Sequence, residues 1–237
     1  MLIQHDGLRE VGAVISQDST LDLDSTRCSM CAAVRAPAPD AWDEPLFESA
    51  NFVAVTSIGA LVPGWLLIVP RKHQLSMGFL SNALSSELHA FKNDVADVLG
   101  EIYGPVSAFE HGPSAAKRLA GCGVDHAHLH LVPTTIDLRR EAEPFLPSGA
   151  AWMVADEGAC KRAALNDLDY LYLEQPLGSG SIVAHDGIGS QIFRRVIASA
   201  LNVPEQFNWR EHRQLENVMS SIWTIRAYEQ RRLAGCT

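Results

Sequence analysis

Three histidines alternate with apolar residues in the segment DHAHLHLVP. His126, His128 and His130 occupy every second position, and Ala127 and Leu129 stand between them. In a β-strand, alternate side chains point to the same face, so this spacing predicts three imidazoles side by side with the apolar residues in the core. A neutral imidazole is a nucleophile, a proton carrier and a metal ligand near neutral pH. The segment is therefore a candidate reaction centre, and the alternatives are a metal site or a functionless His-rich outer face.

A second candidate cluster is the thiol pair Cys28 and Cys31, separated by two residues among five cysteines in all. The N-terminal residues lack the apolar stretch of a secretory signal, and no apolar run is long enough for a membrane span. A reducing, cytoplasmic setting follows as an expectation, and there a C-x-x-C pair indicates a metal or redox site. The strand-to-helix context of redox pairs is absent, which favours metal over redox, with two ordinary buried thiols as the alternative.

The elements that must position these residues can be predicted from periodicity. Apolar residues from Leu84 to Ile102 fall on one stripe with a 3.6-residue repeat, which predicts a long helix stopped by Gly104-Pro105. Strands are predicted over residues 47–55, 65–69, 106–110 and 126–132. Hairpins with one packed helix indicate an α+β fold with a mostly antiparallel sheet.

The second part of the chain continues with short predicted strands at 151–154, 170–174 and 181–184 and helices at 190–201 and 210–226. We therefore expect an N-terminal arm (1–25), a main domain (26–145) and a C-terminal α/β extension (146–237) packed on it. Gln191, Arg194 and Arg195 lie near a helix start. A solvated helix face is the expected environment of Arg194, and a clamp on a substrate phosphate is the alternative.

Residues 126–132 match the motif of the histidine triad (HIT) superfamily, His-φ-His-φ-His-φ-φ with φ apolar, at every position. The segments LVPGWLLIVPRKH (61–73) and FEHG (109–112) also resemble HIT sequences, so the resemblance covers roughly residues 26–135. It implies a HIT-like nucleotide-binding α+β fold, commonly a homodimer. It also implies that the middle histidine attacks the α-phosphorus of a small nucleotide substrate.

Carried over by position, the resemblance implies that His128 is the nucleophile of a nucleotidyl hydrolase. A nucleotidyl-histidine intermediate would form and release a nucleoside monophosphate on hydrolysis. His130 is implied to contact and stabilise the phosphate, and Glu110 to lie near the phosphate or leaving group. Backbone amides around Gly121 and Gly123 are expected to donate to the phosphate as a nest does.

Two positions bear on the reaction type. Where HIT proteins often carry Ser, Thr or Gln near the leaving group, this chain has Gly123, which leaves the preferred leaving group open. The third triad position is His130, as in the hydrolase branches, whereas transferases and phosphorylases usually have Gln there. We therefore expect a hydrolase. The alternatives are a nucleotidyl transferase or phosphorylase of the same superfamily and a non-catalytic, zinc-stabilised nucleotide-binding module.

Zinc-bearing HIT proteins provide a ligand set for the thiol pair. The resemblance implies that Cys28 and Cys31 bind one structural Zn²⁺ together with His73 and His126, and His111 is a reserve ligand. Four N and S ligands suit a closed tetrahedral zinc site. Such a site would anchor one end of the triad segment beside His128.

The overall charge limits the possible partners. The chain has 237 residues and a net charge of −9, from 19 basic and 28 acidic side chains. An acidic chain has no long-range attraction to a polynucleotide backbone, whereas a small nucleotide needs only a local cluster of donors. Phe52, Val53 and Leu67 are expected either to line a purine pocket or to be plain core.

Overall fold

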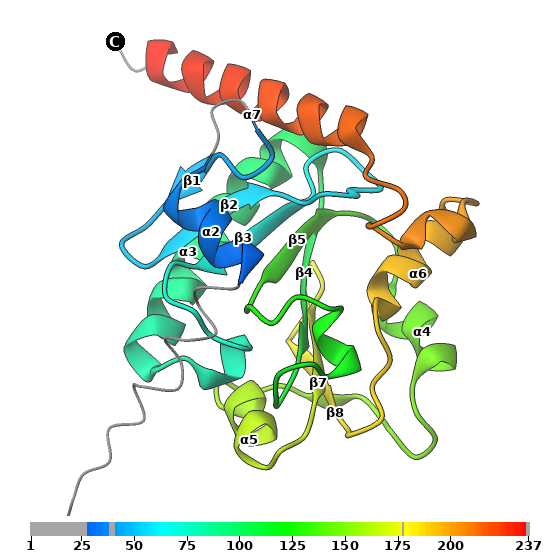
Figure 1. Cartoon of the computed structure of the whole chain (residues 1–237). Coiled ribbons are helices and arrows are strands. Elements are labelled where there is room, and N and C mark those ends of the chain that lie inside the picture. The colour runs from blue at the N-terminus through cyan, green and yellow to red at the C-terminus, as the bar shows by residue number, and fades with distance from the viewer. Residues whose placement is uncertain (1–27, 38–40, 177, 236–237) are drawn as a thin grey trace, which may run out of the picture.

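One antiparallel sheet of eight strands runs through most of the chain. The computed structural model describes residues 28–37, 41–176 and 178–235, so the predicted arm at 1–25 lies outside the described residues. The strands lie in the order β1-β2-β3-β5-β4-β7-β8-β6 (Figure 1). Their bounds are β1 (Phe47–Glu48), β2 (Phe52–Thr56), β3 (Leu66–Pro70), β4 (Val106–Gly112), β5 (Leu129–Pro133), β6 (Met153–Val154), β7 (Tyr170–Glu174) and β8 (Ser181–Ala184).

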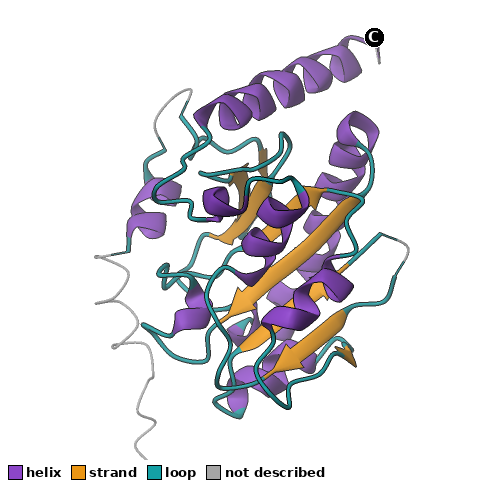
Figure 2. Ribbon diagram, turned by 90° about the vertical axis from the view of Figure 1, so that its right-hand side faces the viewer, coloured by secondary structure: helices purple, strands orange, loops and turns teal. Residues whose placement is uncertain are grey.

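Helices lie on both faces of this sheet (Figure 2). The α-helices are α2 (Ser29–Arg35), α3 (Asn82–Tyr103), α4 (Leu138–Ala142), α5 (Ala159–Leu165), α6 (Ile192–Ala200) and α7 (Leu215–Gly235). Short 3-10 turns are η1 (Met77–Phe79), η2 (Leu119–Gly121), η3 (Glu143–Phe145) and η4 (Pro204–Phe207). The α+β class with a long packed helix is therefore confirmed.

The long helix α3 forms where the apolar stripe predicts it. The Ser81 hydroxyl accepts the Leu84 N–H at the N-terminus, and Gly104 ends the helix with a positive φ of 92°. Phe91, Val95 and Leu99 pack in one core with Ala54, Ile68 and Leu131 from the sheet, together with Ala127 and Leu129. The apolar residues between the histidines therefore lie in the core, as the alternation predicts.

The opposite sheet face carries the second core and the candidate site. Phe109 pairs with His130 across β4 and β5, and His130 pairs with Leu67 of β3, so these three side chains share this face. Phe193 of α6 packs against Phe109, with ring centroids 4.6 Å apart. The triad face is thus covered by α6, which belongs to the C-terminal part of the chain.

The two parts of the chain share the sheet. Strand β7 pairs with β4 along its length, from Ala108 opposite Glu174 to Gly112 opposite Tyr170. Helix α7 lies across the β1–β2 end (Figure 1), where the Ser221 hydroxyl accepts the Gly64 N–H at 2.8 Å. Residues after 145 therefore contribute strands and a packed helix to the same sheet, while the division into a main domain and an extension at 145/146 stays a prediction.

Two elements start three or more residues later than predicted. Regular pairing of the triad strand begins at Leu129 rather than His126, because Pro70, which would face Ala127, has no N–H to extend the ladder. Ala127 instead donates its N–H to the Gln74 carbonyl at 2.7 Å. The last helix begins at Leu215 rather than Arg210, because the preceding residues form a turn around Asn208.

Candidate active site and metal cluster

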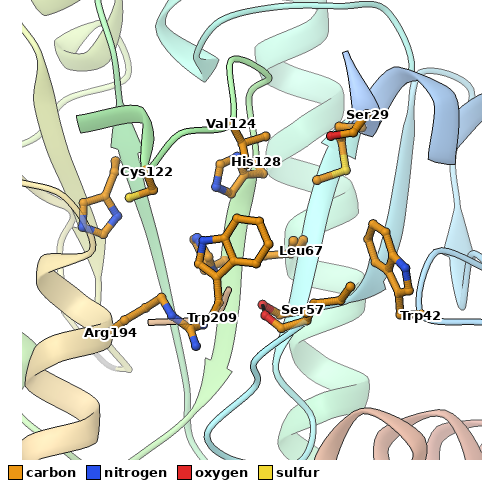
Figure 3. Close-up of a pocket in the computed structure, with 13 residues that line it drawn as sticks. Ser29, Trp42, Ser57, Leu67, Cys122, Val124, His128, Arg194 and Trp209 are labelled. Atoms are coloured by element: carbon orange, nitrogen blue, oxygen red, sulfur yellow. Dashed lines mark hydrogen bonds between the residues drawn. The ribbon is translucent and has the colours of Figure 1, made fainter. Parts of the chain in front are cut away.

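A cavity of about 140 Å³ opens on the face of the sheet that carries the triad. Two of the three triad histidines, His128 and His130, line it. Figure 3 shows His128 between an end that carries Trp42 and Leu67 and an end that carries Cys122 and Arg194. Trp209 extends over the cavity from the C-terminal part of the chain. The remaining lining residues are Ser29, Met30, Ser57, Ile58, His111 and Val124.

The His128 ring is held by its own backbone. Its Nδ1 lies 2.7 Å from the carbonyl oxygen of His126. A carbonyl only accepts hydrogen bonds, so Nδ1 carries the proton and Nε2 keeps its lone pair. The ring is partly exposed and lines the cavity, which leaves Nε2 available as a nucleophile.

His130 is held in the opposite tautomer. The Trp65 indole N–H donates to Nδ1 of His130 at 2.9 Å. Because an indole nitrogen is only a donor, Nδ1 of His130 must be the acceptor, and Nε2 carries the proton. The ring also stacks on Phe109, with centroids 4.5 Å apart and planes 19° apart. The two neighbouring rings, 5.1 Å apart, therefore offer one lone pair and one N–H.

The protein keeps these rings neutral. Burial lowers the pKa of His128, and the hydrogen bond to the His126 carbonyl partly opposes this. Burial, followed by the nearby His128, His111 and Arg194, lowers the pKa of His130 well below its usual value. Neutral imidazoles are the form that nucleophilic attack and hydrogen bonding to phosphate need near neutral pH.

Of the residues predicted to bind phosphate, the structure brings His130 to the cavity and places Glu110 elsewhere. Glu110 is on the α3 face of β4, where its carboxylate accepts the Met77 N–H at 2.8 Å and the Tyr170 hydroxyl at 2.5 Å. Its neighbour His111 points to the opposite face and lines the cavity. Alternation along β4 explains the difference, because a shift of one residue reverses the face.

The glycine segment reaches the cavity through its other residues. Cys122 and Val124 line the cavity, whereas Gly121 and Gly123 do not. The N–H groups of Cys122 and Val124 bond to the carbonyls of Leu119 and Gly121 in a tight turn. These two amides are therefore used within the turn. Binding of a phosphate by the backbone amides around Gly121 and Gly123 stays a prediction.

Gly123 has a structural explanation in the C-terminal extension. Its φ of 75° favours glycine, and a Cβ placed there would lie 2.2 Å from Nη2 of Arg210. Arg210 donates from Nη2 to the carbonyls of Cys122 and Gly123, each at 3.2 Å. The guanidinium thus takes the place of the missing side chain. Ser114, the serine on the same loop, uses its N–H and its hydroxyl to bond to the Asp169 carboxylate.

Sequence reasoning missed Trp42 and Trp209 as lining residues and expected a different environment for Arg194. Arg194 is 3% exposed rather than on a solvated helix face, because α6 turns it inward beneath the cavity. Trp42 and Trp209 come from loops that carry no periodic signal. Leu67 lines the cavity, whereas Phe52 and Val53 are fully buried core.

The four predicted metal ligands come together at the end of the triad segment. The ligand atoms of Cys28, Cys31, His73 and His126 all lie within 4.8 Å of one another. Nδ1 of His73 and Nδ1 of His126 each lie 3.3 Å from the Cys31 sulfur, and the Cys28 sulfur is 3.4 Å from Nδ1 of His126. His111, the reserve ligand, lies outside this cluster.

The chemistry of these donors fits a metal. Nε2 of His126 lies 2.9 Å from the Pro70 carbonyl, so it donates and leaves Nδ1 unprotonated toward the sulfurs. Burial, and next the Cys28 thiol, raise the pKa of Cys31 to about 12. A Cys31 thiolate in this buried setting would therefore need a cation beside it. Two sulfurs and two nitrogens are the donor set that Zn²⁺ prefers in closed sites.

Comparisons with known proteins give structural neighbours only. No protein-family model matches the chain, and no curated protein matches it. A hypothetical protein from Leishmania major has a TM-score of 0.40 and 20% identity over 48% of this chain and 77% of that one. A zinc-bound histidine triad family protein from Mycobacterium smegmatis has a TM-score of 0.38 and 25% identity over 60% and 95%.

A third solved structure is yeast Ap4A phosphorylase in complex with AMP, with a TM-score of 0.37 and 14% identity over 69% of this chain and 72% of that one. The chain is thus similar to structures named for the superfamily that the sequence motif indicates. Because each TM-score is below 0.5, we base the chemistry on this chain's own residues. Within the described residues, no helix is both long and apolar enough to cross a membrane.

Proposed function

We propose that this chain is a HIT-type nucleotidyl hydrolase that uses His128 as its nucleophile. One observation carries the proposal: Nδ1 of His128 is bound to the His126 carbonyl at 2.7 Å, which leaves Nε2 unprotonated beside an open cavity. The neighbouring His130 is held with its Nε2–H as a donor. A lone pair next to a fixed donor is the arrangement that in-line attack on a phosphate needs.

The reaction proceeds in two displacements. Nε2 of His128 attacks the α-phosphorus, an N–P bond forms, and the bond from phosphorus to the leaving group breaks with its electron pair. Water then attacks the same phosphorus, the N–P bond breaks, a proton is released, and a nucleoside monophosphate leaves. His130 donates to a non-bridging oxygen in both steps. Splitting one displacement into two lowers each barrier.

The nucleoside binds at the apolar end of the cavity. Trp42 and Leu67 line that end and pack in one apolar cluster with Met30 and Val124, and these surfaces can cover the faces of a flat base. Among the residues that the structure describes, no acidic side chain lines the cavity, so these residues do not repel a phosphate although the chain carries a charge of −9. The substrate is therefore a small nucleotide conjugate.

We also propose that Cys28, Cys31, His73 and His126 hold one structural Zn²⁺. The metal would supply only folding energy and rigidity, because four protein ligands leave no open position. A homodimer and a cytoplasmic setting are further parts of this proposal, and they rest on the resemblance and on the cysteine content.

The test compares wild-type protein with His128→Ala on a dinucleoside polyphosphate and a nucleoside 5′-phosphoramidate. We expect wild type to release the nucleoside monophosphate and to show a nucleotidyl adduct by intact-protein mass spectrometry. His128→Ala should lose turnover by about 1000-fold or more while keeping its fold and nucleotide binding. His89→Ala, an exposed histidine on α3, is the matched control and should behave as wild type.

Turnover of His128→Ala at the wild-type rate would show that His128 is not the nucleophile. Release of a nucleoside diphosphate only when inorganic phosphate is added would instead identify a phosphorylase. Nucleotide binding without turnover by wild type would favour the binding module.

A further inference from the structure

A buried cation borders the cavity without a carboxylate to neutralise it. The Arg194 side chain donates from Nε to the Phe207 carbonyl at 2.8 Å and from Nη2 to the Gly59 carbonyl, and its guanidinium lies 4.9 Å from the Trp65 ring centroid. Among the described residues, no Asp or Glu forms an ion pair with it. Burial of an uncompensated charge is unfavourable unless a ligand supplies the opposite charge.

An imidazole without partners lines the same cavity. His111 is 3% exposed, and neither of its ring nitrogens has a hydrogen-bond partner. Burial, followed by His128 and Arg194, lowers its pKa to about 3, so the ring is neutral with one N–H and one lone pair. A buried polar group without a partner requires an explanation, and a ligand in the cavity would provide one.

The positions of these groups relative to the nucleophile define what they would bind. Arg194 and Cys122 lie at the opposite end of the cavity from Trp42 and Leu67, with His128 between the two ends (Figure 3). His111 lines the same cavity, close enough to both His128 and Arg194 for each of them to lower its pKa. With the nucleoside at the apolar end, the other end receives the group that leaves.

We infer that Arg194 and His111 form an anion subsite for the leaving group, so that the preferred substrate carries at least one further phosphate beyond the α-phosphate. This inference rests on the proposed function. When the P–O bond breaks, its electron pair moves to the bridging oxygen of the departing phosphate. Arg194 neutralises that charge, and the N–H of His111 donates to a phosphate oxygen.

The glycine at 123 agrees with this substrate class. A phosphate or polyphosphate departs as an anion and needs no proton, whereas an amine leaving group must be protonated as it departs. Gly123 has no side chain that could donate a proton to a leaving group, and the neutral His111 is a weak acid. The site therefore stabilises a charged leaving group rather than protonating a neutral one.

The test uses the full-length protein and two substrates with the same nucleotidyl group. One is a dinucleoside polyphosphate, with a phosphorylated leaving group, and the other is a nucleoside 5′-phosphoramidate, with an amine. His111→Leu should keep the fold, because the ring packs between Phe109 and Phe193 and makes no hydrogen bond. We expect it to lower kcat/KM for the polyphosphate at least about 10-fold more than for the phosphoramidate.

Arg194→Gln should show the same selective loss, and Arg195→Gln is the matched control. Arg195 is the next residue on α6, stacks over the Phe207 ring at 3.8 Å and does not line the cavity, so its variant should leave both rates unchanged. A binding readout complements the rates. Inorganic tripolyphosphate, titrated by calorimetry, should bind the His111→Leu and Arg194→Gln proteins about 10-fold more weakly than wild type.

The outcomes separate the two proposals. Equal losses on both substrates together with unchanged tripolyphosphate binding would overturn the anion subsite and leave the hydrolase intact. No nucleoside monophosphate from either substrate with wild type would overturn the hydrolase. The calorimetric comparison would then still decide whether Arg194 and His111 bind an anion.

Discussion

Two hydrogen bonds set the chemical roles of neighbouring histidines. A backbone carbonyl leaves Nε2 of His128 with a free lone pair, which is the nucleophile in the proposed reaction, and the Trp65 indole makes Nε2 of His130 an N–H donor. The two rings have the same intrinsic chemistry, and only their partners distinguish them. A residue that does not reach the substrate, Trp65, is therefore a positioning residue for the reaction.

Replacing Trp65 by Phe tests this role. Phenylalanine keeps an aromatic ring beside Phe109 but removes the N–H that fixes the His130 tautomer. We expect kcat to fall by about 10-fold, the order of one lost hydrogen bond in free energy. Nitrogen NMR shifts of His130 should change from one tautomer to a mixture, which loss of packing alone would not produce.

Trp223→Phe is the control for that substitution, because Trp223 is 65% exposed on α7. It should change neither kcat nor the histidine shifts. A Trp65→Phe protein with wild-type kcat and one unchanged His130 tautomer would refute the positioning role.

At the scale of elements, the proposed metal cluster joins three segments, which are α2, the residues after β3 and the residues before β5. Helix α2 has only seven residues, too few to be stable alone, and Cys28 is its N-cap. His73 follows β3, and His126 precedes β5. Met30 of α2 lines the cavity, so loss of metal should disturb the nucleoside end as well as the fold.

Removal of the metal should therefore destabilise the protein and weaken catalysis. We expect about one zinc per chain by elemental analysis of protein prepared without chelator. Cys31→Ser should lose the zinc and lower the thermal midpoint by roughly 10 °C, which corresponds to about 3 kcal/mol for a chain of this size. Cys160→Ala, which removes a thiol outside the cluster, should retain the metal. Metal-free wild-type protein with an unchanged midpoint would exclude the zinc site.

At the scale of the whole molecule, a single sheet connects the two parts of the chain through β4 and β7. Glu110 lies on β4 at this junction between β4 and β7. Its carboxylate accepts the Met77 N–H from the part of the chain before residue 146 and the Tyr170 hydroxyl from the part after it. Burial is the largest effect on its carboxyl group and raises the pKa to about 7 from an ordinary value of 4.5. The free energy of unfolding of the whole protein should therefore depend on the protonation of Glu110.

The sign of this dependence follows from the shift. Between pH 4.5 and 7 the folded protein binds the proton more tightly than the unfolded chain, so the free energy of unfolding falls as pH rises. The fall attributable to Glu110 is about 3 kcal/mol. The free energy of unfolding can be measured by denaturant titration at pH 5 and pH 8 with saturating zinc. In Glu110→Gln, the decrease between these two pH values should be smaller than in wild type by the amount attributable to Glu110. An equal decrease in the free energy of unfolding for wild type and Glu110→Gln would contradict the prediction. Glu143→Gln, at an exposed site, is the control and should behave as wild type.

Local periodicity made much of the fold predictable. The α3 stripe and the strands at Tyr170–Glu174 and Ser181–Ala184 follow from spacing within single segments. The pairing of β7 with β4 does not, because it joins segments about 60 residues apart and leaves no local trace. The start of β5 was misplaced for a similar reason, since it depends on Pro70 in another strand.

The residues of the candidate site were also only partly predictable from the sequence. The triad and the C-x-x-C pair are contiguous patterns, so their residues could be named from the sequence. Arg194 and Trp209 reach the cavity only through the fold. One signal was available: Arg194 lies three and four residues before the buried Ile197 and Ala198, a helical spacing that indicates an inward face. Its charge suggested a solvated position, and burial next to a ligand site is the exception to that rule.

The contact between Gly123 and Arg210 links two positions almost 90 residues apart. A serine or glutamine at 123 would be strained by the positive φ and would displace the end of the Arg210 side chain, and loss of the arginine would leave the two turn carbonyls without their donor. Substitutions at these sites are therefore expected to be tolerated in pairs and to be harmful singly. Among descendants of this sequence, glycine at 123 and arginine at 210 should be inherited or lost together.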